Sequence, residues 1–185
     1  PLFDICFASY LLSGIIFLVY SAFPKALLSR IGYLLQAIGL ISGATLFTIV
    51  WRESGYPPLR NLHESMTLMA HCIVLWNITQ SLVHPLRLLL PVSGLSAGLL
   101  MAWASASGGV QEHTLPALQS SFWLTSHVFL SMLSYAALAL GALAYLFRLM
   151  AYSGAHRVAA TGVFSLLACG GGAAAVVEIL LSYGV

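Results

Sequence analysis

Charged residues are scarce in this sequence: only 6% of its 185 residues are Asp, Glu, Lys or Arg. Average soluble domains carry about 25%, so the composition excludes an ordinary soluble globular protein. The net charge is only +2 and no run of Lys or Arg occurs, which argues against nucleic acid as a partner. The three cysteines form neither Cys-x-x-Cys nor Cys-x-x-Cys-His. These residues therefore contain no covalent haem attachment motif and no thiol–disulfide exchange motif.

Apolar residues make up 60% of the sequence and gather in six long runs. A run of about 20 apolar residues can cross the roughly 30 Å hydrocarbon layer as a helix, and helices satisfy their own backbone polar groups in lipid. The sequence therefore predicts an all-α, polytopic membrane protein in which residues 1–185 form one transmembrane domain. The predicted spans are Leu2–Ala22, Ile31–Trp51, Leu62–Leu82, Pro85–Trp103, Phe122–Met150 and Ala160–Tyr183.

Basic residues in the short loops predict the orientation. Five of the seven lie in alternate loops, 23–30, 83–87 and 148–159, whereas Arg52 and Arg60 lie in the others. Because basic loops stay in the cytoplasm, both ends of the sequence are expected on the outer side. The predicted location is the inner (cytoplasmic) membrane, with the chloroplast thylakoid membrane as a second alternative. The glycine pairs Gly39/Gly43 and Gly94/Gly98 are typical of close helix packing in lipid.

Ionisable residues inside a span are costly, and each is a functional hypothesis. Three are expected in the outer half of the membrane: His71, His127 and Glu178. Each histidine lies on a polar stripe at helical spacing. One stripe contains Glu64, Thr67 and His71, beside His63, and the other contains Trp123, His127, Ser131, Ser134 and Tyr135. Such stripes are expected to point into a helix bundle.

A non-covalent, b-type haem would suit these residues. Neutral imidazole is a good iron ligand, so His71 and His127 are a candidate pair of ligands. Arg52 and Arg60 are candidate partners of the haem propionates, and Trp123 is a candidate for packing against the porphyrin ring. Simpler explanations compete with each assignment. A histidine in a span can bond a backbone carbonyl, outer tryptophans form interfacial belts, and Glu64 stands at the third position after Asn61, as in a capping box.

Two segments resemble the CcsA/ResC type of cytochrome c assembly protein, the haem-handling membrane subunit of cytochrome c synthase. The first is Pro57-Pro58-Leu59-Arg60-Asn61-Leu62-His63-Glu64-Ser65. The second runs from Pro116-Ala117-Leu118-Gln119-Ser120 through Trp123-Leu124 and His127-Val128 to Ser134-Tyr135-Ala136-Ala137. The resemblance covers roughly residues 30–175. It implies haem handling at the outer membrane face, with His127 as an axial ligand and Pro57, Pro58, Asn61 and Glu64 as motif positions.

The sequence departs from the family pattern in three places. His63 replaces the usual tyrosine, His71 is an addition, and a tryptophan-rich haem loop would follow Gly184, where the sequence stops. Either these residues are a portion of a longer protein, or they form a short relative in which His71 pairs with His127.

Three functions remain open on this basis. The first is a haem-handling protein for cytochrome c maturation, with apocytochrome c or a haem-protein subunit as its partner in a larger membrane complex. The second is a b-haem or quinone-interacting subunit of a respiratory complex, with Glu178 or Glu64 as a proton group. The third is a structural membrane subunit without a cofactor.

Overall fold

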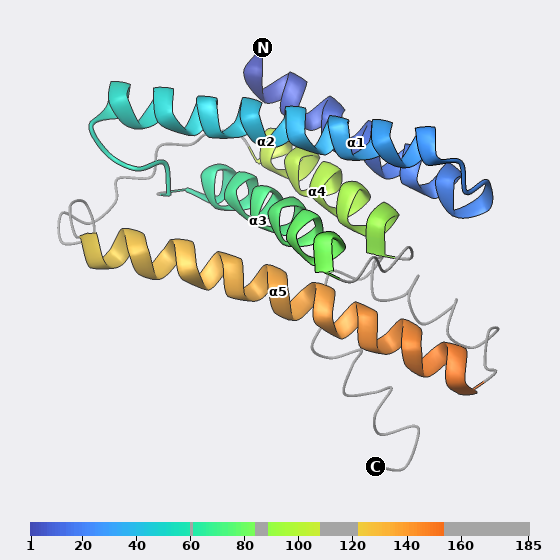
Figure 1. Cartoon of the computed structure of the whole chain (residues 1–185). Coiled ribbons are helices and arrows are strands. Elements are labelled where there is room, and N and C mark those ends of the chain that lie inside the picture. The colour runs from blue at the N-terminus through green and yellow to red at the C-terminus, as the bar shows by residue number, and fades with distance from the viewer. Residues whose placement is uncertain (60, 84–88, 108–121, 154–185) are drawn as a thin grey trace. The chain divides into compact units, whose positions relative to one another are not determined.

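The computed structural model describes residues 1–59, 61–83, 89–107 and 122–153 (Figure 1). All regular structure in these ranges is helical, as the sequence predicts. Contacts divide the chain into two units, Pro1–Ala144 and Tyr145–Val185, and the description below concerns the first. The helices are α1 (Leu2–Ala22), α2 (Ala26–Ser54), α3 (Leu62–Val83), α4 (Leu89–Ala106) and α5 (Phe122–Ser153).

Four segments of the described chain are long and apolar enough to cross a membrane: α1, α2, α4 and residues Thr125–Phe147 of α5. Together they make the protein a multi-pass membrane protein. The segment α3 was predicted as a span but is not among the four, because it carries polar residues along its length. The sixth predicted span, 160–183, lies outside the described residues.

Helices α1 and α4 meet at a pair of glycines. A Cβ atom on Gly94 would lie 2.5 Å from the backbone nitrogen of Gly14, and one on Gly14 would lie 2.5 Å from the backbone nitrogen of Leu95. One turn further along α4, a Cβ on Gly98 would lie 3.2 Å from the Cα of Leu11. The predicted packing role of Gly94 and Gly98 is therefore confirmed.

The other predicted glycine pair works differently. A Cβ on Gly39 would lie 2.3 Å from the ring of Tyr10, and one on Gly43 would lie 1.5 Å from Nε2 of His71. These two glycines of α2 make room for aromatic rings from α1 and α3, so their predicted role in close helix packing is confirmed, with rings as the partners. The physical reason is that a missing Cβ leaves a notch, and a ring fills it as well as a backbone does.

The helix α3 has a buried cluster on each side. Ala70 and Val74 pack with residues of α1 and α4, namely Cys6, Tyr10, Ala97 and Met101. On the other side, Leu68, Cys72 and Ile73 of α3 pack with Ala136 and Leu140 of α5. The neighbouring helices therefore cover α3, which explains how a helix with several polar residues is accommodated in an apolar bundle.

Candidate functional site

The first family-like motif leads into α3 through a helix cap. The side-chain oxygen of Asn61 accepts a hydrogen bond from the backbone N–H of Glu64 at 2.8 Å. This bond satisfies one of the N–H groups that a helix start leaves without a partner. The predicted capping role of Asn61 is thus confirmed. The cap fixes where α3 begins, and so where His63 and Glu64 stand.

Replacing Asn61 with alanine is expected to lower the stability of the bundle by about 1 kcal/mol, because the cap bond is lost. Unfolding by denaturant in mixed detergent micelles measures the effect. The matched control is Asn61→Ser, which keeps a side-chain acceptor and should lose clearly less. Equal losses in the two variants would show that the cap does not contribute.

The imidazole of His63 is held by two neighbouring helices. Its Nδ1 lies 2.7 Å from the carbonyl oxygen of Ala104 in α4, and its ring stacks on Phe3 of α1 with centroids 5.2 Å apart. A carbonyl only accepts hydrogen bonds, so Nδ1 carries the proton and donates it. In the neutral ring this leaves Nε2 with its lone pair. His63 therefore ties α3 to α1 and α4 while keeping one nitrogen that can act as a ligand.

His71 is enclosed by the bundle. Its Nδ1 donates to the carbonyl of Thr67, one turn earlier in α3. Its Nε2 lies 3.6 Å from the sulfur of Cys6 and against Gly43, and its ring meets Tyr10 edge-on, with centroids 5.6 Å apart. With Nδ1 protonated, the Cys6 thiol is the donor to Nε2. Both ring nitrogens of His71 are thus engaged by the protein.

His127 lies in a different environment. Its side chain is exposed, and no hydrogen bond joins it to the described part of the chain. About two and a half turns separate it from Ala136, so it lies on the side of α5 opposite the face that packs against α3. Trp123 and Tyr135 on the same stripe are 80% and 58% exposed. Within residues 1–144 as described, this stripe does not point into the bundle as predicted, because α5 packs through its alanine and leucine face.

Among the described residues, the predicted site residues do not gather at one centre. Arg52 is exposed in the last turn of α2, while Arg60 and Glu178 lie outside the described residues. The described ranges contain no group of three or more His, Cys, Asp or Glu side chains that could hold a metal ion. His71 contacts α1 and α2, and His127 lies on the far side of α5. The structure therefore does not bring the two histidines together.

Sequence reasoning missed a buried polar network in the centre of the bundle. The amide of Asn77 in α3 donates to Gln36 in α2 at 3.2 Å, and Gln36 donates to Ser93 in α4 at 3.4 Å. Gln36 and Ser93 are fully buried, and Asn77 is 2% exposed. The sequence analysis considered only ionisable residues within the spans. Neutral amides also need hydrogen-bond partners there, because lipid offers none.

Comparison with known proteins finds relatives in cyanobacteria. The chain is similar to the proteins named cytochrome c biogenesis protein CcsA of Nostoc punctiforme, at 36% identity over 144 residues, and of Gloeobacter violaceus, at 32% over 145 residues. The protein of that name in Microcystis aeruginosa is 36% identical over 143 residues. The matches cover 73–74% of this chain but only 40–43% of the relatives, so the chain spans about two fifths of their length. No family model and no solved structure matches.

Proposed function

The chain is of the CcsA type over 74% of its length, and from that premise we propose that it forms part of a haem-handling membrane protein for cytochrome c maturation. In this proposal it binds a non-covalent haem through His127 near the outer face of the inner membrane. Its partner is apocytochrome c or a haem-protein subunit of a larger membrane complex. The proposal is supported by the relatives' name and by the long motif around His127.

The exposure of His127 carries the proposal. An axial ligand needs a neutral ring nitrogen that a large planar group can reach. His127 meets this need, because its ring is exposed and unbonded to the described part of the chain. His71 does not, because Cys6 and Gly43 occupy the space in front of its Nε2.

Neighbouring residues would assist binding and orientation. Trp123, one turn before His127, would pack against the edge of the ring system. Arg52, exposed at the end of α2, and Arg60 are proposed as partners of the propionates on the strength of the sequence motif. Bound haem supplies the vinyl groups for thioether formation. The reacting thiols belong to the apocytochrome, so the chain needs no nucleophile of its own. Its role in this proposal is to hold the haem in a fixed orientation and to exclude competing reactions.

The alternative of a bis-histidine electron-transfer haem gains no support from the geometry. It requires His71 to give up its contacts with Thr67 and Cys6 and to turn out of the bundle. The two readings predict different spectra for the same variants, so a single experiment separates them.

Optical spectra of the purified chain, oxidised and reduced, test the proposal. We expect a haem spectrum that falls at least about tenfold in His127→Ala, in line with the loss of a direct ligand, and that remains in His71→Ala. The control is Ser134→Ala, an exposed position on the same stripe. Imidazole added to His127→Gly should restore the spectrum.

Haem retained by His127→Ala would overturn the proposal. Parallel loss of haem in both histidine variants would favour the bis-histidine haem, and a folded chain without haem would favour a structural subunit.

A further inference from the structure

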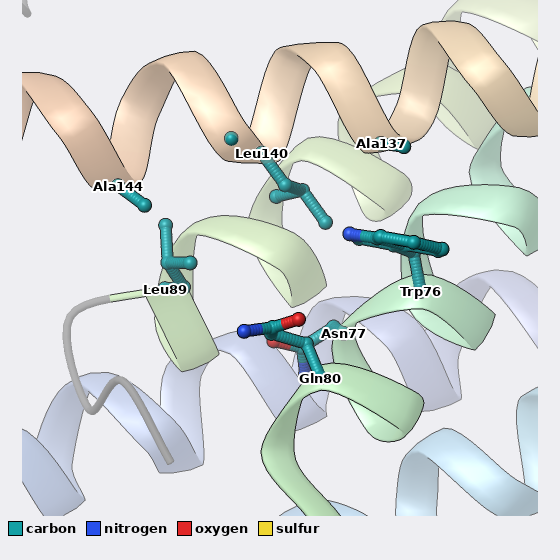
Figure 2. A pocket seen from close by; sticks show the side chains of 8 residues that line it. Trp76, Asn77, Gln80, Leu89, Ala137, Leu140 and Ala144 are labelled. Carbon is teal, nitrogen blue, oxygen red and sulfur yellow. The ribbon is translucent and has the colours of Figure 1, made fainter. Parts of the chain in front are cut away.

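A pocket of about 160 Å³ lies between α3, α4 and α5 (Figure 2). It is separate from the histidines described above and is partly open at the surface of the bundle. In Figure 2 the side chains from the three helices face one another across it. Its lining residues are Trp76, Asn77, Gln80, Leu89, Ala137, Leu140, Gly141 and Ala144.

The lining combines apolar walls with hydrogen-bond donors. Most of the lining surface is apolar, with leucine, alanine and glycine residues of α4 and α5 among its members, and none of the lining residues is charged. Trp76 contributes an indole N–H and Gln80 contributes a carboxamide. Neither of these two groups makes a hydrogen bond within the described part of the chain. Asn77 stands beside them and is held by Gln36, so this side of the pocket is fixed to the buried polar network.

The size of the pocket limits its occupant. A protein cavity of about 150 Å³ binds a single benzene molecule, so this pocket has room for one six-membered ring and none for a porphyrin. The absence of charge among the lining residues disfavours a phosphate head group, because a buried anion needs a paired cation. These two donors make no hydrogen bond within the described residues, which disfavours a plain acyl chain, because such a chain would leave them unbonded.

We propose that this pocket binds the ring of an isoprenoid quinone. A ring carbonyl would accept hydrogen bonds from Gln80 and Trp76, and the ring would lie against Leu89, Leu140 and the small residues of α5. The apolar tail would leave through the open side of the pocket into the lipid. This inference concerns binding alone and does not rest on haem binding by His127.

Gly141 offers a way to fill the pocket without disturbing the bundle. A Cβ at this position meets nothing within 4 Å, so Gly141→Leu should fold while its side chain occupies the space of the ring. The next residue, Ala142, is exposed and does not line the pocket. Ala142→Leu is therefore the matched control for added bulk on α5.

The test uses the chain in phosphatidylcholine nanodiscs and a decyl-substituted benzoquinone with a photoreactive azide. Wild type and Ala142→Leu should label saturably on α3 or α5, as read by peptide mass spectrometry. Gly141→Leu and Gln80→Leu should label at least about tenfold less, as expected when a ring site is filled or a polar contact is removed. Unlabelled decylbenzene should compete poorly, because it lacks the carbonyl.

Three outcomes would overturn the proposal: equal labelling of Gly141→Leu and Ala142→Leu, unchanged labelling of Gln80→Leu, or equal competition by decylbenzene. The last result would identify a site for apolar chains only. The haem spectrum of Gly141→Leu should match that of wild type, which separates a failure of the quinone site from a failure of the haem proposal.

Discussion

Replacing Gly94 with leucine is expected to destabilise the bundle by more than about 3 kcal/mol, because overpacking at a rigid contact cannot be relieved by a side chain. The first added carbon would lie 2.5 Å from the nitrogen and 2.6 Å from the Cα of Gly14. Both are backbone atoms of α1, so α1 and α4 have to separate. Separation would open the cluster in which Cys6 and Tyr10 of α1 pack with α4. Unfolding by denaturant in mixed micelles measures the loss.

The matched control for Gly94→Leu is Gly141→Leu. It makes the same chemical change within a long helix, at a position where a Cβ meets nothing within 4 Å. Its stability should fall by no more than about 0.5 kcal/mol, because the added side chain has open space at the pocket between α3, α4 and α5. Similar losses in both variants would show that leucine is harmful in any of these helices and that the contact between Gly14 and Gly94 is not special.

Features that depend on local rules could be predicted from the sequence. The helix α1, Leu2–Ala22, agrees with the predicted span, because a long apolar run defines a membrane helix by itself. The start of α3 is equally local, since Asn61 and Glu64 are three residues apart and need no other part of the chain to form the cap. The multi-pass character follows from the same apolar runs.

Features that depend on the partner of a helix face could not be predicted. The polar stripes of α3 and α5 both have helical spacing, yet His71 contacts α1 and α2, whereas His127 is exposed on the described part of the chain. A polar stripe indicates that a face is unsuited to lipid, but it does not say what covers that face. The glycine pairs show the same limit, because one pair meets a backbone and the other meets rings.

The second large effect is expected at Gly43. Alanine there would place its Cβ 1.5 Å from Nε2 of His71, so the imidazole has to leave its notch and break its contacts with Thr67 and Cys6. We expect a loss of about 2–3 kcal/mol, typical of overpacking in a well-packed core. His71→Ala alone should cost about 2 kcal/mol, because it leaves the notch empty.

The double variant Gly43→Ala/His71→Ala decides whether these losses have a common cause. With the ring removed, the alanine methyl enters the space that His71 occupied, so the double variant should be no less stable than His71→Ala. The resulting coupling energy of about 2 kcal/mol is within the range for residues in direct contact. Additive losses would contradict the packing described at Gly43. Under the proposal that His127 ligates haem, haem bound per folded chain should be unchanged in all three variants, because His71 packs α3 against α1 and α2.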